Sequence, residues 1–455
     1  MTHQLNAQEL RSTLNGTVLT PIDPDFESAR AMFYHHDRVP AVVVRPRPTS
    51  DVVTAVRYAR RAGLTVGVKS GGHGLGSLGV PPDGLLLDLG DMKGLDIDAD
   101  GRTAWAEPGV TAGEYTHALS EHGLATGFGD SPEVGIGGIA LSGGIGFLSR
   151  RHGLTIDNLL AVELVTATGD VVVANETHHP ELFWALRGGG GNFGVATRFK
   201  FRLLPVDDIS GGTVVFEATP EVVHEALEFA RGAPDELTAI LSVMRAPPLP
   251  FLPPAAHGKV IAMLGCAWLG DPEEGEAIIS RLRALGTPLL DDLGRKRYRD
   301  LFPEAAELPF TPREASTIVY LNDFGRGHAK HVVSALRESD ALMANVQLRV
   351  LGGAIARVPA DATAYAYRDR ELMAAVYTVF LDPAEEQARR SWVDDTVDGL
   401  DVAGGTYVGF QVDNSAAGVL STYPESTLAR LRKVKLQWDA ENLFRSNLNV
   451  APEEA

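Results

Sequence analysis

The 455-residue chain has one cysteine, Cys266, so no disulfide within the chain can form. Cys266 lies in the apolar run 260–268, which predicts a buried strand and a packed thiol rather than a nucleophile. No apolar run is long enough to span a membrane. Residues 1–16 lack the basic start and apolar core of a secretion signal. We therefore expect a cytoplasmic protein with no membrane partner.

Basic residues are outnumbered, because 41 Lys and Arg stand against 59 Asp and Glu and give a formal charge of −18. Nucleic acids and anionic membranes need a basic face, so we expect no nucleic-acid partner. An anionic ligand would have to be held by backbone dipoles instead of net charge. The remaining composition, 44% hydrophobic and 22% charged, is that of a globular protein, and the length favours two cores.

Glycine is abundant, and the densest run is residues 66–79, VGVKSGGHGLGSLG. Such density lets successive N–H groups turn inward around a pyrophosphate, so this run predicts a cofactor loop. Its last six residues spell GxGxxG, the fingerprint of a nicotinamide-binding Rossmann fold. That fingerprint must open a helix, but Pro-Pro-Asp-Gly at 81–84 predicts a turn, followed by a strand at 85–89. The context therefore argues against a nicotinamide site.

Several motifs together resemble the berberine-bridge-type FAD-linked oxidases of the vanillyl-alcohol-oxidase superfamily, and especially their bacterial nicotine-oxidase branch. They occur in family order over nearly the whole chain, at residues 70–73, 135–138, 141–144, 152–158, 181–194 and 442–449. The resemblance implies an α+β fold with a two-domain FAD-binding architecture and an antiparallel-sheet substrate domain backed by helices. The implied domains are residues 1–205 for the first part of the FAD domain, 206–405 for the substrate domain, and 406–455 for a segment returning to the FAD domain.

The resemblance also implies that the flavin is bonded to His73, on its dimethylbenzene methyl. A neutral imidazole is nucleophilic near neutral pH and adds to an electrophilic flavin methide; the alternative is a histidine that only hydrogen-bonds the loop. Many relatives have a second, cysteinyl tether where this chain has Ser131, so FAD should be attached through His73 alone. The implied cofactor-binding residues are Lys69, Ser70, Gly71, Gly72, His73, Gly74, Gly138, Ser142, Gly143, Gly144, Asn158, Val195, Asn447 and Asn449. Some of these glycines could serve packing instead.

Oxidation at carbon usually needs a base for the proton on oxygen or nitrogen. Relatives often place it in a Tyr-x-Asn-Tyr segment, which here reads Tyr407-Val-Gly-Phe410, and a phenylalanine takes no proton. The catalytic candidates are Tyr407, Tyr377 and Arg349. Either tyrosine could instead be a core residue. Arg349 could hold an anionic substrate or stabilise a phenolate, whereas an amine with a free lone pair needs no base.

These residues predict an FAD-linked oxidase that removes two electrons from a small organic substrate, such as an alcohol, sugar, amine or phenolic metabolite. Dioxygen would be the acceptor and hydrogen peroxide the product. The alternatives are an FAD-dependent dehydrogenase, a biosynthetic oxygenating or cyclising flavoenzyme of the same fold, or a catalytically silent flavoprotein. We expect no metal, because the histidine pairs at 35–36 and 178–179 lack ligand spacing. The sequence does not indicate an oligomeric state.

Local patterns predict the elements of both halves. Thr111 and Glu114 form a predicted capping box, and residues 168–170 a hairpin turn. In the second half, apolar and amphipathic periods predict strands at 213–217, 237–244, 259–268, 316–321, 346–358 and 372–380, and helices at 221–231, 272–285 and 383–400.

Overall fold

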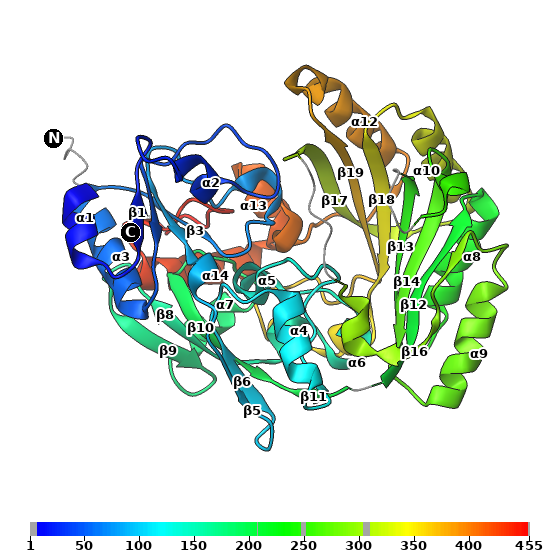
Figure 1. The fold of residues 1–455 in the computed structure, drawn as a ribbon, viewed down its shortest axis with the longest axis horizontal. Coiled ribbons are helices and arrows are strands. Elements are labelled where there is room, and N and C mark those ends of the chain that lie inside the picture. The colour runs from blue at the N-terminus through cyan, green and yellow to red at the C-terminus, as the bar shows by residue number, and fades with distance from the viewer. Residues whose placement is uncertain (1–6, 207, 247–251, 304–309, 454–455) are drawn as a thin grey trace.

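The computed structural model describes residues 7–206, 208–246, 252–303 and 310–453. Two halves lie side by side (Figure 1). The cofactor half contains residues up to 206 and the C-terminal segment from 403, and the substrate half contains one large antiparallel sheet with its helices. This is the expected α+β fold. In the described part of the chain, no helix has both the length and the apolar character needed to cross a bilayer.

A small sheet of the cofactor half carries the glycine loop. Its strands lie in the order β1 (Thr17–Leu19), β2 (Val42–Arg45), β4 (Leu85–Asp88) and β3 (Val66–Lys69). The last three are parallel, and helix α3 (Thr49–Ala62) connects β2 to β3. Gly63 ends this helix with a φ of 67°, a left-handed conformation that suits glycine. After β3 the chain forms only a 3₁₀ turn, Leu75–Ser77, before β4, so the GxGxxG run opens no α-helix, as predicted.

A second, antiparallel sheet supports the rest of this half. Its order is β5 (Leu95–Asp98), β6 (Thr103–Ala106), β10 (Val195–Arg202), β8 (Leu159–Val165) and β9 (Val171–Asn175). The predicted hairpin joins β8 to β9. The predicted capping box opens α4 (Ala112–Ser120), since Glu114 N–H donates to Thr111 Oγ1 at 3.2 Å and Thr111 N–H donates to Glu114 Oε2 at 2.9 Å. Two further helices, α7 (Pro180–Leu186) and α14 (Glu425–Trp438), share its core, so the chain's C-terminal part returns to this half.

The large sheet dominates the substrate half. Its order is β15 (Leu290–Asp291), β12 (Asp208–Glu217), β14 (Val260–Trp268), β13 (Leu237–Arg245), β18 (Met343–Val350), β19 (Leu372–Phe380), β17 (Arg313–Asp323) and β20 (Asp401–Val402), with β16 (Gly294–Arg297) beside β12. Helices cover its outer face (Figure 1): α8 (Pro220–Arg231), α9 (Pro272–Arg283), α10 (Arg326–Glu338) and α12 (Glu386–Asp398). Cys266 on β14 is packed as predicted, and burial raises the pKa of its thiol to about 12.

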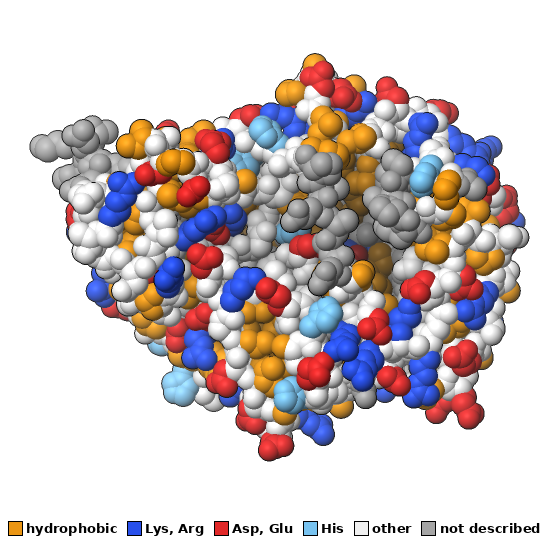
Figure 2. Space-filling model, viewed as in Figure 1, with side chains coloured by type: hydrophobic (Ala, Val, Ile, Leu, Met, Phe, Trp, Pro, Cys, Tyr) orange, Lys and Arg blue, Asp and Glu red, His pale blue; other side chains and the backbone are white. Residues whose placement is uncertain are grey.

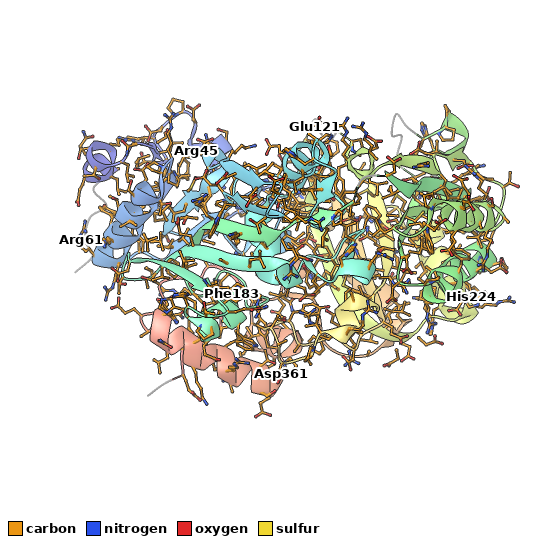
Figure 3. The ribbon with its side chains drawn as sticks, turned by 90° about the horizontal axis from the view of Figure 1, so that it is seen from below. Arg45, Arg61, Glu121, Phe183, His224 and Asp361 are labelled. Carbon is orange, nitrogen blue, oxygen red and sulfur yellow. The ribbon has the colours of Figure 1, made fainter. Side chains whose placement is uncertain are left out.

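The two faces of the large sheet differ in polarity. Ala315, Val346 and Val376 belong to the core beneath the helices. Because side chains alternate along a strand, the residues between them face the cofactor half, and many are polar: Glu314, Ser316, Asn345, Gln347, Arg349 and Tyr377. Seen from below (Figure 3), Arg61 on α3 and His224 on α8 lie at opposite ends of the molecule.

Several element predictions differ from the structure. Strand β12 begins at Asp208, five residues before the predicted start at residue 213. The strand expected at 346–358 ends at Val350, and helix α11 (Ala354–Arg357) follows, because Gly352 and Gly353 have φ values of 80° and 55° that turn the chain. Helix α10 was not predicted at all. Strand β17 begins at Arg313, three residues before the predicted start, and this shift adds a polar residue to the inner face.

Candidate functional site

A cavity of about 670 Å³ lies between the glycine loop and the polar face of the large sheet. In the space-filling view a hollow opens between the two halves (Figure 2). The cofactor half lines the cavity with the loop after β3, with parts of 129–145 and 189–192, and with residues 447–448; the substrate half lines it from β17, β18 and β19. Both glycine clusters of the sequence therefore meet at one site.

The glycine loop offers unpaired backbone donors to this cavity. The N–H groups of Gly71, Gly72 and Gly74 donate to no other group of the described residues. A Cβ on Gly71 would lie 2.3 Å from the nitrogen of Gly135, so only glycine permits this approach of the two loops. At Gly74 and Gly138 a Cβ would meet no atom within 4 Å and would project into open space. Free N–H donors around an open cradle fit a diphosphate.

His73 lies in the same loop, with its ring stacked on Phe33 at 4.6 Å between centroids. Burial lowers the pKa of His73, opposed by the charge of Glu133, so the ring is neutral near pH 7. Its nitrogens make no hydrogen bond within the described chain. A neutral imidazole with both nitrogens available is what attachment to a flavin methyl requires. Ser131, at the place of the second tether, also lines the cavity.

Lys69 and Ser70 line the cavity, but their side chains have partners inside the protein. Lys69 Nζ donates to Ala29 O at 3.0 Å and to Asp88 Oδ2 at 3.3 Å. Ser70 Oγ donates to Pro108 O at 2.5 Å. These side chains therefore fix the loop and bring no free positive charge to a ligand.

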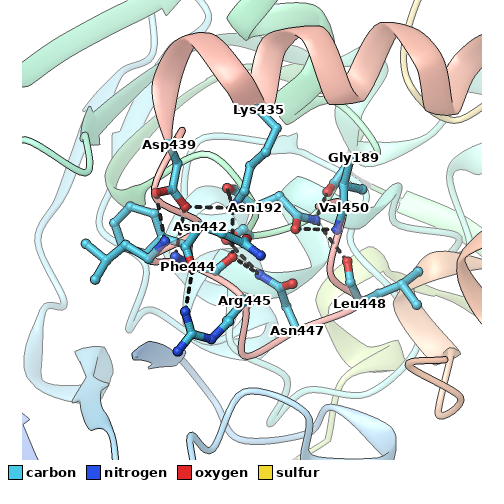
Figure 4. A network of polar contacts seen from close by, with 12 residues as sticks. Gly189, Asn192, Lys435, Asp439, Asn442, Phe444, Arg445, Asn447, Leu448 and Val450 are labelled. Atoms are coloured by element: carbon cyan, nitrogen blue, oxygen red, sulfur yellow. Dashed lines mark hydrogen bonds and ion pairs between the residues drawn. The ribbon is translucent and has the colours of Figure 1, made fainter. Parts of the chain in front are cut away.

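Asn447, in the C-terminal segment, also lines the cavity and belongs to a network of polar contacts (Figure 4). Its Nδ2 donates to Gly191 O at 3.0 Å and to Phe444 O at 3.2 Å, which leaves the buried Oδ1 without a partner in the described residues. Above it in this view, the fully buried Lys435 donates to Asp439 Oδ2 at 2.6 Å and to Asn192 O at 2.7 Å and holds the turn in place. The unpaired Oδ1 is an acceptor for a ligand hydroxyl or ring N–H.

Nine of the fourteen predicted cofactor residues line the cavity: Lys69, Ser70, Gly71, Gly72, His73, Gly74, Gly138, Ser142 and Asn447. The other five, Gly143, Gly144, Asn158, Val195 and Asn449, are not part of its wall. Asn158 Nδ2 donates to His152 O at 3.0 Å, and Val195 is fully buried in the core. Among the described side chains, no group of three or more His, Cys, Asp or Glu could hold a metal ion.

The three predicted catalytic residues all line the cavity. The hydroxyl of Tyr407 accepts a hydrogen bond from Gly144 N–H at 2.8 Å. The hydroxyl of Tyr377 accepts one from Asn345 Nδ2 at 2.7 Å. Burial raises the pKa of both phenols, so each is protonated at neutral pH and neither is a base by itself.

Arg349 is already neutralised by the protein. Its Nη2 donates to both carboxylate oxygens of Asp130, at 2.9 and 3.0 Å, and Nη1 donates to Ile145 O at 3.0 Å. The oxygen of Gln347 accepts from Nη2 at 2.7 Å, and the guanidinium lies 5.6 Å from the ring centre of Phe410. With its charge paired and most donors used, Arg349 shapes the cavity and has little left to offer an anionic substrate.

Glu314 and Tyr34 were missed by the sequence analysis. Glu314 Oε1 accepts a hydrogen bond from Gly76 N–H at 3.1 Å, while the buried Oε2 has no partner at standard hydrogen-bond geometry among the described residues. Burial raises the pKa of Glu314. The Ser316 hydroxyl and the Gly76 N–H both lower this pKa, against the larger effect of burial. Tyr34 lines the cavity. The available signal was the alternation of Glu314 and Ser316 with Ala315 at the start of an otherwise apolar strand.

Known proteins share this architecture. Residues 40–175 match the FAD binding domain family, and residues 421–451 match the family described as berberine and berberine like. (R)-6-hydroxynicotine oxidase from Paenarthrobacter nicotinovorans is 30% identical over 97% of this chain and 98% of its own. Chitooligosaccharide oxidase from Gibberella zeae is 28% identical over 91% of this chain and 87% of its own. The crystal structure of 6-hydroxy-D-nicotine oxidase from Arthrobacter nicotinovorans matches with a TM-score of 0.86 at 25% identity, covering 97% of this chain and 99% of that one.

Proposed function

Because the chain belongs to the berberine-bridge-type FAD-linked oxidases of the vanillyl-alcohol-oxidase superfamily, we propose that it oxidises a neutral or cationic small organic molecule by two electrons. The oxidised bond is a C–O or C–N bond of an alcohol, sugar, amine or phenolic compound. Dioxygen receives the electrons and becomes hydrogen peroxide. Bound FAD supplies the two-electron acceptor of this chemistry.

The residues that hold FAD in this proposal are those with free polar groups at the cavity. The N–H groups of Gly71, Gly72 and Gly74 bind the diphosphate, and Asn447 Oδ1 accepts from a flavin or ribityl donor. His73 provides the single covalent bond, since Ser131 lacks the thiol that a second one needs. Relatives named as oxidases of 6-hydroxynicotine and of chitooligosaccharide support the oxidase reading.

One observation carries the proposal that the substrate is neutral or cationic: the charges on the cavity wall opposite the glycine loop. Arg349 is paired with Asp130, and Lys69 with Asp88. Glu133 lines the cavity and has no ion-pair partner among the described residues, so the site carries an uncompensated negative charge. Such a site repels anions and accepts neutral or cationic molecules.

Anaerobic mixing tests the proposal. The purified protein is mixed without oxygen with matched aromatic probes: benzylamine, benzyl alcohol and the anionic alcohol 4-(hydroxymethyl)benzoate, then with nicotine-like amines and small sugars. We expect the flavin absorbance to bleach with at least one amine or neutral alcohol and not with 4-(hydroxymethyl)benzoate. Air should restore the colour within seconds and yield peroxide. Slow return over minutes would indicate a dehydrogenase, and no bleaching with any compound would contradict the proposal.

A further inference from the structure

We propose that Phe33 positions His73 for its bond to the flavin, by fixing the plane of the imidazole ring. The inference deepens the proposed function and rests on its covalent attachment through His73. Phe33 lies outside all the motifs that carried the resemblance, so the sequence gave it no role. The test measures attachment of the cofactor and does not depend on substrate oxidation.

Phe33 contacts the loop of His73 through its ring and through its backbone. The two ring centres are 4.6 Å apart and the ring planes are 23° from parallel, so the phenyl ring covers one face of the imidazole. The Phe33 N–H donates to Gly72 O at 2.9 Å, directly before His73 in the chain. Both rings line the cavity. The stacked pair therefore forms part of the wall of the cofactor site.

No hydrogen bond within the described chain orients the imidazole of His73. A histidine that acts through one ring nitrogen is usually held by a hydrogen bond to the other nitrogen. Here burial and the charge of Glu133 act on the ring, and neither fixes its rotation. The lone pair of a ring nitrogen lies in the plane of the ring. The face contact with Phe33 therefore sets the plane in which this lone pair points.

Phe33 is itself held by its two neighbours in the chain. Met32 belongs to a buried apolar core and places its Sδ 3.6 Å from the position of a Cβ on Gly72. On the other side, the ring of Tyr34 meets the ring of Phe33 edge to face, with 4.9 Å between their centres. Phe33 is 38% exposed, so its ring contributes little to the core. Its stack on His73 gives this exposed ring a function.

The attachment balances with dioxygen as its only further reagent. A nitrogen of the neutral His73 ring forms a bond to the methyl carbon of the flavin, while one methyl C–H bond and the imidazole N–H bond break. Two protons and two electrons remain, and they reduce the flavin. Dioxygen, the acceptor of the proposed function, takes them up as hydrogen peroxide. Phe33 forms no bond in this sequence and acts through His73, by limiting the orientations of the imidazole.

Phe33→Leu tests the stack, because leucine keeps an apolar side chain and removes the planar ring. Cells are harvested at several times after induction, and the purified protein is denatured in acid and weighed by intact mass spectrometry. Protein without bonded flavin is then incubated with added FAD in air and followed in the same way. We expect Phe33→Leu to attach flavin about tenfold more slowly than the wild type, because the reacting nitrogen is less often in the productive orientation. Phe33→Tyr keeps the ring and should attach flavin at the wild-type rate.

The total flavin content separates this positioning role from a structural one. With FAD in excess and before acid treatment, Phe33→Leu should bind as much flavin per protein as the wild type, so only the bonded fraction differs. Val39→Ala is the matched control, because Val39 is 43% exposed in the same loop before β2 and is not part of the cavity wall.

Three results would each overturn the proposal: a wild-type attachment rate in Phe33→Leu, a Phe33→Tyr variant as slow as Phe33→Leu, or equal losses of bound and bonded flavin. An equally slow Val39→Ala would also overturn it, since a general disturbance of the loop would then explain the effect. Failure of the proposed covalent attachment gives a different result, because the wild type itself would then carry no acid-stable flavin.

Discussion

The guanidinium of Arg349 and the carboxylate of Asp130 form a two-fold hydrogen-bonded ion pair, with N–O distances of 2.9 and 3.0 Å, across the cavity between the two halves. The Arg349 side chain is 3% exposed and that of Asp130 is 23% exposed. This contact joins the segment before Ser131 to the middle of the substrate sheet. It fixes the position of both. Among the described residues, Arg349 is the one Lys or Arg that the large sheet contributes to the cavity wall, and the pairing with Asp130 neutralises its charge.

Asp130→Asn should therefore destabilise the protein. The substitution leaves the buried Arg349 charge without its counter-ion, and we expect a loss of about 3 kcal/mol in unfolding free energy. Replacing both partners, with Arg349→Met added, should recover most of this loss. Urea unfolding followed by flavin fluorescence and circular dichroism measures both. Asp208→Asn, which breaks an exposed pair with Arg295, is the control and should cost less than about 1 kcal/mol. Equal midpoints for the two single variants would contradict the expectation.

Tyr407→Phe tests the hydrogen bond that holds the turn beneath the cavity. The Gly144 N–H is buried and donates to the Tyr407 hydroxyl. The variant leaves this N–H without an acceptor, which should lower the free energy of unfolding by about 1–3 kcal/mol. We expect lower stability and slower substrate oxidation, because the ring forms part of the cavity wall. Tyr423→Phe is the matched control: its hydroxyl is buried and donates to Gly188 O at 3.2 Å, and neither residue is part of the cavity wall, so stability alone should change. A larger rate loss in Tyr423→Phe would contradict this assignment.

How far the sequence predicted the site depended on whether the signal was local. The glycine loop, the capping box at Thr111 and the turn at 168–170 are set by neighbouring residues, and the structure has them as predicted. The pairing of Arg349 with Asp130 joins residues far apart in the chain, so no local pattern indicated that Arg349 is neutralised.

Glu314 was missed for a different reason. The predicted strand began at Ser316, because Arg313 and Glu314 are charged and charged residues usually mark the end of a buried strand. Pairing with β19 extends the strand through Arg313, since the sheet supplies hydrogen bonds that propensity does not foresee. Both Asn447 and Asn158 match the family's motifs, but only Asn447 lies at the cavity wall. The Asn158 amide instead donates to His152 O in the turn before β8, and motif resemblance does not distinguish these two roles.

His73→Ala should abolish covalent attachment. Wild-type protein denatured in acid should retain the flavin mass on intact mass spectrometry, and the variant should show the bare polypeptide. Adding Ser131→Cys to His73→Ala supplies a thiol at the cavity wall, which we expect to form the missing thioether and restore the adduct. Flavin that stays on His73→Ala after acid would show that another residue carries the bond.

Asn447→Ala should weaken flavin binding in the His73→Ala background, where affinity can be measured. Its buried Oδ1 has no partner in the described chain, so a ligand donor is the group that would satisfy it. We expect the dissociation constant for FAD to rise about tenfold, equivalent to one lost hydrogen bond of about 1.4 kcal/mol. Asn175→Ala is the control, because Asn175 lies outside the cavity wall and its Oδ1 already accepts a hydrogen bond from Thr177 N–H at 2.9 Å. An equal effect of both variants would contradict a specific role of Asn447 in binding FAD.

Glu314 should make the protein less stable as the pH rises, which is the opposite of what an acid with a lowered pKa would do. Its pKa is raised by burial from an ordinary 4.5. An acid with a raised folded-state pKa stabilises the fold fully below about pH 4.5 and loses this contribution as the pH rises through the raised value. Glu314→Gln should therefore match the wild type in acid and unfold at higher urea near neutral pH.

Asp323→Asn supplies the opposite sign on the same strand. Backbone and Arg231 hydrogen bonds lower the pKa of Asp323 from 3.8, so its contribution is present above that value and disappears as the pH falls. The Asp323 variant should thus be the less stable one at neutral pH, where the Glu314 variant is the more stable one. A Glu314→Gln protein less stable than the wild type near neutral pH would mean that the carboxylate has a partner that stabilises its charge, and it would count against an unpaired acceptor at this position.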